Sequence, residues 1–362
     1  MRRSPAGRSI VPTWIAIIVC VALPLGCTDF AILPSEPPLD YDSSLDLARE
    51  TASGWSEPVN IGSGVNSAFQ ERSPALSPDK LSLYFTSDRP GGFGGSDLYV
   101  SRRECLECPF GPAVNLGPNI NTPGNDGTPQ VSTDGRLLLY SRPMPDGFED
   151  IVVSERQDKH DDLGWGPPKG LCRELNEQAA HFNTPWLMKK PEKGGPNFYY
   201  SSRPTFAVPL RIFRATVTEH DGDDGSPYFG TCHNVERATE LNQDDLATTN
   251  DGSVTIRKDG KELFFWSGRP DASGVPDARI WTATRSQNDG AWSAPVSVGP
   301  PIDSPVFPEF FPHLSRDAQT LVFVRGSRGG PGLNDIWITE RTLLADDDDG
   351  ECDEELSNSR GC

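Results

Sequence analysis

Residues Ser73 to Arg103 read SPALSPDKLSLYFTSDRPGGFGGSDLYVSRR, and this stretch decides the fold. It contains a turn, a strand of aromatic and aliphatic residues, a second turn that carries Ser and Arg, and another strand. The same order returns four more times, in TPQVSTDGRLLLYSRPMPDGFEDIVVSER, TPWLMKKPEKGGPNFYYSSRPTFAVPLRIFRATV, GSVTIRKDGKELFFWSGRPDASGVPDARIWTATR and FPHLSRDAQTLVFVRGSRGGPGLNDIWITER. Because each unit must bury its apolar face against the next one, the five copies predict a repeat architecture.

A further element lies between the copies and adds a fourth strand to each unit. It reads WSEPVNIGSGVNS at Trp55, FGPAVNLGPNINT at Phe110, WGPPKGLCRELNE at Trp165 and WSAPVSVGPPIDS at Trp292, with a weaker copy at Thr231. Four antiparallel strands per unit, arranged radially, are typical of a β-propeller blade. The chain is therefore expected to be all-β, with five blades, or six if residues 207–230 contain a degenerate one. Because the copy at Trp55 precedes the first unit, this N-terminal strand is expected to complete the last blade and close the ring.

The repeat resembles a known family. SPDKLSLYFTSDRPGGFGGSDLYVSRR, STDGRLLLYSRP and DIWITER are similar to the WD-type repeat of TolB-like bacterial β-propellers, over about residues 55–341. The third unit departs from the pattern, since KKPEKGGPN replaces the expected Ser-x-Asp-Gly turn. The resemblance implies a propeller scaffold that binds partners, with no shared catalytic residues.

The N-terminus predicts export. Residues 1–26 have an arginine-rich start and a short apolar run, which is typical of a signal peptide. ALPLGC resembles a bacterial lipoprotein signal in which Cys27 carries the lipid, although Pro24 departs from that pattern; an ordinary secretory signal is the alternative. Residues 27–54 are expected to form a flexible acidic, Pro-rich tether. The expected location is the bacterial cell envelope, on its periplasmic or surface face.

The formal net charge is −19, which disfavours nucleic acid and anionic membrane surfaces as partners. A protein or cell-envelope partner is expected instead, with a monomeric chain that touches the membrane only through its lipid. Residues 342–362 form an acidic, Cys-containing tail, and its run ADDDDGECDEE does not fit the spacing of a calcium loop.

Six cysteines are expected to form disulfides in an exported chain. The proposed pairs are Cys105 with Cys108, Cys172 with Cys232, and Cys352 with Cys362, among 15 possible connectivities. No pair of Cys or His residues has metal-site spacing beside them, so neither a metal nor a cofactor is expected.

Polar residues recur at fixed places in the units and have a structural explanation. They are Asp97, Asp150 and Asp335 before the last of the three strands, and Arg89, Arg142, Arg203, Arg269 and Arg328 after the preceding strand. Recurrence in separate units favours one framework role, such as an Asp/Arg hydrogen bond across the hairpin, over a ring of ligands. The recurrent aromatic residues are expected to pack between blades.

Two functions remain open from the sequence. No nucleophile elbow, zinc-protease motif, phosphate loop or dinucleotide fingerprint occurs, so the chain is expected not to be an enzyme and to have no catalytic residues. The first interpretation is an envelope-anchored, non-enzymatic propeller that acts as a protein-interaction or cell-wall-binding scaffold. The alternative is a glycan-binding or glycoside-hydrolase-type propeller with carboxylates in its central channel.

Overall fold

The computed structural model describes residues 54–188, 197–220, 226–243, 249–270, 278–287, 290–326 and 333–342. All of these residues belong to one compact unit, Leu47–Cys362. Among them, no helix has both the length and the apolar character needed to cross a bilayer. The two cysteines of the tail, Cys352 and Cys362, and the lipid candidate Cys27 lie outside the described residues, as does Arg328.

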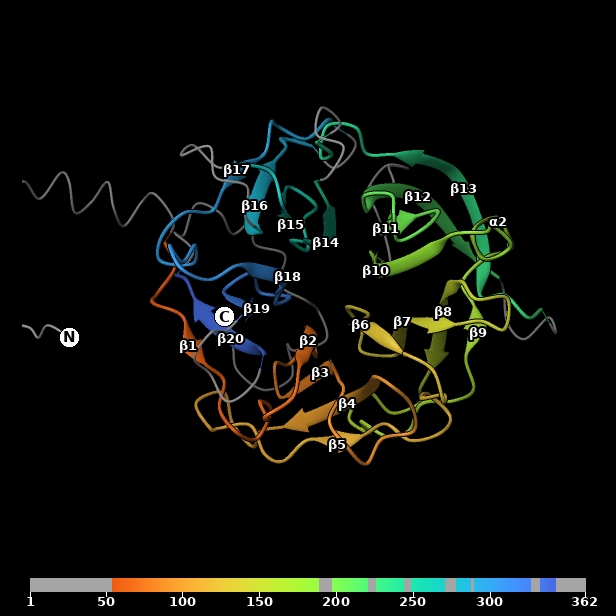
Figure 1. Ribbon diagram of the computed structural model, residues 1–362, viewed down its shortest axis with the longest axis horizontal. Coiled ribbons are helices and arrows are strands. Elements are labelled where there is room, and N and C mark those ends of the chain that lie inside the picture. Colours follow the sequence, from red (N-terminus) through yellow and green to blue (C-terminus); the bar gives the residue numbers. More distant parts are fainter. Residues whose placement is uncertain are drawn as a thin grey trace, which may run out of the picture. The chain divides into compact units, whose positions relative to one another are not determined.

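Nearly all of the regular secondary structure in the described residues consists of antiparallel strands, in groups of four (Figure 1). The first group is β2 (Glu71–Leu76), β3 (Ser82–Ser87), β4 (Asp97–Arg102) and β5 (Val114–Asn115). The second group is β6 (Gly127–Val131), β7 (Leu137–Pro143), β8 (Glu149–Glu155) and β9 (Lys169–Gly170), followed by the short helix α2 (Arg173–Asn176). The third is β10 (His181–Leu187), β11 (Phe198–Arg203), β12 (Arg211–Glu219) and β13 (Gly230–Arg237). The described part of residues 207–230, where a degenerate blade was the alternative, thus lies in and around the third group.

The fourth group is β14 (Asp251–Ile256), β15 (Glu262–Ser267), β16 (Arg279–Thr284) and β17 (Val296–Ser297). The fifth is β18 (Glu309–Leu314), β19 (Thr320–Gly326), β20 (Asn334–Glu340) and β1 (Val59–Asn60). The second and third groups merge into one eight-stranded sheet through a single parallel register pair, His181 with Glu149. The first strands of the groups contact one another in the cyclic order β2, β6, β10, β14, β18 and back to β2. The groups therefore surround a common centre (Figure 1).

The strand at the start of the described chain completes the last group, as expected from the sequence. Val59 pairs with Ile338 and Asn60 with Trp337, and Trp55 forms a bridge to Arg341. The Trp55 ring is buried and meets the Phe264 ring edge-on at 6.0 Å. The two ends of the strand-rich region are thereby held together by backbone pairing and by a buried aromatic contact.

Every first strand carries a β-bulge whose central residue has a left-handed backbone. These residues are Ser73, Thr128, Thr184, Ser253 and Phe311, with φ of 49°, 53°, 50°, 55° and 51°. A bulge bends its strand and increases the local twist, which suits strands that converge on a narrow centre. Two of the bulge amides also join neighbouring groups, since Thr184 N donates to Thr128 Oγ1 (3.1 Å) and Ser253 N donates to Thr184 Oγ1 (3.3 Å).

Aromatic residues from the second strand of each group are part of the core. Tyr84, Phe85, Tyr140, Tyr199, Tyr200, Phe264, Phe265 and Phe323 are buried, in agreement with the expected packing role. Trp266 is the exception, because it is only partly buried and contacts Phe310 and Phe311 beside the centre.

Candidate functional site

In four groups an arginine binds a carboxylate of the group's first strand. Arg89 lies 2.9 Å from Glu71, Arg142 3.4 Å from Asp126, Arg269 2.8 Å from Asp251, and Arg325 3.2 Å from Glu309. Each of these carboxylates stands two residues before the bulge residue, and their side chains are fully buried. A neighbouring cation and several donors offset part of the cost of burying a carboxylate, which explains why an arginine recurs in these units. Burial still raises the pKa of Glu309 to about 8 and raises the pKa of Asp126 above its ordinary value.

This arrangement corrects the sequence-based prediction of an Asp/Arg bond across the hairpin in the first two groups, where Arg89 bonds Glu71 rather than Asp97 and Arg142 bonds Asp126 rather than Asp150. Asp97 accepts hydrogen bonds from the amides of Phe93 (2.5 Å) and Gly94 (3.1 Å) instead. Arg142 and Asp150 are register partners on β7 and β8, yet the guanidinium bonds Asp126. In the last group Arg325 bonds Glu309, while Arg328 lies outside the described residues.

The surroundings of Asp150 disfavour its ionised form. Burial, with a smaller contribution from the Asp146 carboxylate, raises the pKa of Asp150 from its ordinary value to about 6. The folded state therefore binds this proton more tightly than the unfolded state, and ionisation between about pH 4 and 6 removes stability that stays lost at higher pH.

Asp150→Asn should consequently stabilise the protein at pH 7 by about 1–3 kcal/mol, because it removes a buried charge that the fold disfavours. At pH 3, below both pKa values, where the carboxyl is mostly protonated in both states, the variant should nearly match the native chain. Urea unfolding at the two pH values measures the difference, with Glu155→Gln, at an exposed position on the same strand, as control. An equal shift at both pH values would contradict the assignment.

The third group departs from this pattern. Phe182, 1% exposed, stands two residues before the bulge residue Thr184, where the other groups have a carboxylate. Arg203 lies opposite His181, one register position beyond the Phe182 and Ser202 pair. Its guanidinium carbon lies 4.3 Å from the centre of the Phe206 ring. Burial lowers the pKa of Arg203 while the Glu149 carboxylate opposes this shift, and the side chain stays cationic at neutral pH.

A groove of about 720 Å³ opens beside Arg203. One wall is the connection after α2, and the other is formed by β11, β12, β13 and the loop between β11 and β12. The lining residues are Gln178, Ala179, Ala180, Ser202, Arg203, Pro204, Val208, Pro209, Arg211, Phe213 and Arg237. We call this feature the third-group groove. Its volume falls in the range of small-molecule sites.

Strand register places three of the lining residues on one face of the sheet. Phe213 and Arg237 are direct cross-strand partners, and Arg211 is two residues before Phe213 on the same strand. Arg211 also donates to the carbonyl of Leu210 (3.1 Å) and lies 3.6 Å from Asp251, so part of its charge serves the framework. The groove thus combines an aromatic face with three guanidinium groups in a chain whose net charge is −19.

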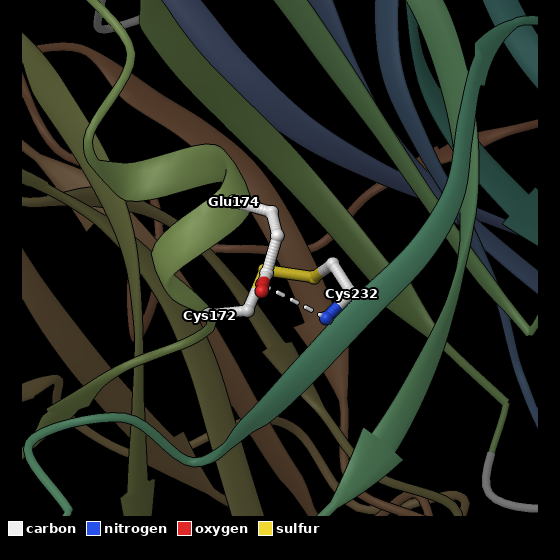
Figure 2. Close-up of side chains that lie close together, drawn as sticks. All are labelled: Cys172, Glu174 and Cys232. Atoms are coloured by element: carbon white, nitrogen blue, oxygen red, sulfur yellow. Dashed lines mark hydrogen bonds between the residues drawn. A yellow bond between two sulfur atoms is a disulfide. The ribbon is translucent and has the colours of Figure 1, made fainter.

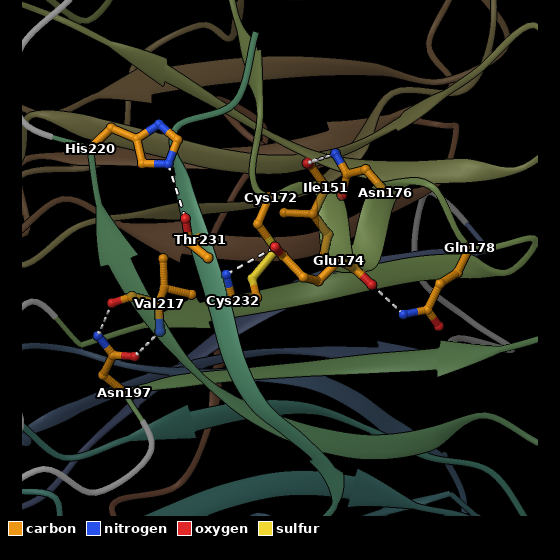
Figure 3. Close-up of a disulfide and its surroundings, with 10 residues drawn as sticks. All are labelled: Ile151, Cys172, Glu174, Asn176, Gln178, Asn197, Val217, His220, Thr231 and Cys232. Atoms are coloured by element: carbon orange, nitrogen blue, oxygen red, sulfur yellow. Dashed lines mark hydrogen bonds between the residues drawn. A yellow bond between two sulfur atoms is a disulfide. The ribbon is translucent and has the colours of Figure 1, made fainter. Parts of the chain in front are cut away.

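A disulfide joins the two walls of the groove. Cys172, just before α2, is bonded to Cys232 on β13, and Glu174 Oε2 accepts a hydrogen bond from Cys232 N at 3.1 Å (Figure 2). Asn176 donates to the Ile151 carbonyl of β8 at 2.8 Å, and Gln178 donates to the Glu174 carbonyl (Figure 3). The helix is therefore fixed to both the second and the third group, which holds Gln178 at the groove.

Both disulfides expected within the described residues are present, Cys105 with Cys108 and Cys172 with Cys232. Cys172, Glu174 and Cys232 place possible ligand atoms within 4.8 Å of one another. Because both sulfur atoms are used in the disulfide, they are not thiolates, and thiolates are what a metal would need.

The central channel offers much less room than the groove. Its cavity, about 30 Å³, is lined by the bulge residues and by Gln130, Trp186 and His313, and no carboxylate is among the lining residues. Burial lowers the pKa of His313 to about 3, so this imidazole is neutral. Such a volume accommodates water but not a sugar ring. The channel carboxylates of the glycoside-hydrolase alternative are therefore not found at this cavity.

The comparisons with known proteins support a β-propeller fold. A thermostable family-43 glycoside hydrolase is 14% identical and superposes over 77% of this chain and 91% of its own length, with a TM-score of 0.50. An α-L-arabinofuranosidase from Lactobacillus brevis is 13% identical and covers 78% of this chain and 94% of its own, also at 0.50. TolB from Acinetobacter baumannii, at 16% identity, covers 78% of this chain and 56% of its own, but its TM-score is 0.39. No family model and no curated protein matches the sequence.

These structures correct one sequence-based expectation. The chain was expected not to be an enzyme because its sequence contains no catalytic motif. That expectation is wrong, since the two solved structures with a TM-score of 0.50 are described as a glycoside hydrolase and an α-L-arabinofuranosidase, so the absence of such motifs does not argue against an enzyme in this fold. At 13–14% identity the likeness establishes the fold alone, and function has to be argued from the site.

Proposed function

We propose that the protein is an exported, envelope-associated five-bladed β-propeller that binds a saccharide in the third-group groove. The five groups correspond to the blades, with β1 as the outer strand of the last one. The two disulfides fit an oxidising compartment, as the signal-like N-terminus predicts. Anchoring through a lipid on Cys27 is part of this proposal.

The observation that carries the proposal is the composition of the groove. Sugars present apolar C–H faces next to hydroxyl groups, and they bind where aromatic faces lie beside hydrogen-bond donors. Phe213 supplies a partly exposed ring, and Phe206, 63% exposed, extends the aromatic surface beyond Arg203. Arg203, Arg237 and Gln178 supply donors around these rings.

The fold adds support of a limited kind. The two solved structures with a TM-score of 0.50 are described as a glycoside hydrolase and an α-L-arabinofuranosidase, proteins named for action on glycosides. The channel cavity of this chain is too small for a sugar, so the groove is the better place for a saccharide.

The proposal predicts that filling the groove abolishes saccharide binding. Ala179 is exposed at the groove wall, and Ala179→Trp should obstruct the groove without disturbing the core. Isothermal titration of the mature protein with a panel of neutral and acidic oligosaccharides should detect binding that this variant loses by about tenfold or more, equivalent to at least 1.4 kcal/mol.

Thr218→Trp is the matched control, because Thr218 is exposed on β12 but does not line the groove. It should bind like the native protein. Two results would overturn the proposal: no saccharide in the panel binds, or Ala179→Trp binds as well as Thr218→Trp.

A further inference from the structure

In four groups the arginine is paired with a buried carboxylate, whereas Arg203 of the third group has no such partner. Arg203 makes no ion pair with a carboxylate in the described part of the chain, and its Nε is buried without a hydrogen-bond partner. The place of the carboxylate is taken by Phe182, which lies in the core. Because Phe182 stands where the other groups have an acid, the Arg203 guanidinium lies without a carboxylate partner at the wall of the third-group groove.

We propose that Arg203 receives the carboxylate of an acidic saccharide, such as a uronic acid, in the third-group groove. This inference rests on the proposed saccharide-binding function and specifies its ligand. The external carboxylate takes the electrostatic role that Glu71, Asp126, Asp251 and Glu309 have in the other groups.

The setting of Arg203 suits a planar carboxylate. Stacking on the Phe206 ring fixes the plane of the guanidinium, which leaves its edge donors to face an acceptor. A carboxylate can accept two parallel hydrogen bonds from such a fork. The buried Nε without a partner shows that the fold leaves part of this guanidinium's hydrogen-bonding capacity unused.

The charges around the groove also favour an anion with a single charge per ring. Arg203, Arg211 and Arg237 bring three positive charges, while Glu149 acts on Arg203 and Asp251 lies 3.6 Å from Arg211. These acids offset part of the positive charge. A doubly charged phosphate is therefore attracted less strongly here than it would be by three arginines without neighbouring acids. Val208, Pro209 and Phe213 provide an apolar wall that fits a sugar ring bearing one carboxylate.

The test compares three ligands on the full mature protein by isothermal titration: trigalacturonate, its methyl ester and galactotriose. Trigalacturonate should bind at least about tenfold more tightly than the other two, because only it presents a carboxylate. Esterification removes the charge without altering the protein, so this comparison does not depend on the folding of any variant. Equal affinity for the acid and the ester would overturn the inference.

Arg203→Gln should reduce trigalacturonate affinity by about tenfold or more and abolish the preference over galactotriose. The control is Arg214→Gln, since Arg214 is on the same sheet but pairs with Glu236 and Glu240. Arg214→Gln should keep the preference, and Arg203→Lys should keep part of it.

The outcomes separate the two proposals. If galactotriose binds as well as trigalacturonate and Ala179→Trp removes both, the saccharide-binding function stands and the role of Arg203 is refuted. If none of the saccharides binds, both fail. Tighter binding of inorganic phosphate or of triglutamate than of trigalacturonate would also refute the acidic saccharide.

Discussion

Deleting residues 54–62 should lower the melting temperature of the mature protein by more than about 10 °C. The deletion removes Trp55, whose buried ring contacts Phe264 at 6.0 Å and lies under the Arg341 guanidinium at 4.6 Å. Loss of a buried Trp side chain alone destabilises a protein by about 3–5 kcal/mol, and a change of 1 kcal/mol shifts the melting temperature of a domain of this size by about 2–4 °C. The deletion also exposes the edge of β20, whose backbone pairs with Val59 and Asn60.

Differential scanning calorimetry measures the effect, and a point substitution on the same strand provides the control. Val59 is 62% exposed, so Val59→Ser keeps the backbone pairing and should change stability by less than about 0.5 kcal/mol. If the deletion melts at the same temperature as the native chain, β1 does not close the ring. If Val59→Ser is as damaging as the deletion, side-chain contacts of this exposed residue, rather than Trp55 and the backbone pairing, stabilise the strand.

The strand order could be predicted from the sequence because its signals are local. Turns such as SPDK and STDG lie between runs of aromatic and β-branched residues, and they recur in the same order. The pairing of β1 with β20 could be predicted by counting the outer strands, because one of them precedes the first unit and none follows the last unit. The outer strands are shorter than the sequence indicated, because β1, β5, β9 and β17 have only two residues each.

The partners of the repeat arginines could not be predicted without the register of the strands. Arg89 and Glu71 are 18 positions apart and meet only because β2 and β3 pair with Glu71 opposite Ser87. A signal was nevertheless present: an acid stands two residues before the bulge position in ERS, DGT, DGS and EFF, whereas the third unit has FNT. Comparison of these triplets would have singled out Phe182 and Arg203.

The third-group groove could not be predicted from the sequence. Its walls come from residues 178–180 and from strands that end at Arg237, and they face each other because the Cys172–Cys232 disulfide holds α2 against β13. The disulfide pairing itself was predicted from cysteine count, but its position beside a groove depends on the face that Phe213 and Arg237 share.

Asp251→Ala should destabilise the protein by about 3–5 kcal/mol, the range measured when one partner of a buried ion pair is removed. Asp251 is fully buried and accepts hydrogen bonds from Ser267 Oγ (2.6 Å), Gln243 N (2.9 Å) and Arg269 (2.8 Å). Its removal leaves the buried Arg269 guanidinium without a counter-charge and the other donors without an acceptor. Urea unfolding at pH 7 measures the loss.

The control is an ion pair at the surface, where solvent screens the charges. Glu236 is 58% exposed by its side chain and lies 2.7 Å from Arg214, so Glu236→Ala should cost less than about 1 kcal/mol. In the double variant Asp251→Ala with Arg269→Met, both charges are absent, and part of the loss should be recovered because no buried guanidinium remains unpaired. A loss for Asp251→Ala no larger than that for Glu236→Ala would mean that water reaches this carboxylate and that the Arg/acid pairs are not what stabilises the four groups that contain them. The double variant could instead be less stable than Asp251→Ala by the full effect of the single substitution Arg269→Met. In that case the two side chains act independently. Arg269 would then stabilise its group through stacking on Phe265 and Trp281 rather than through the carboxylate.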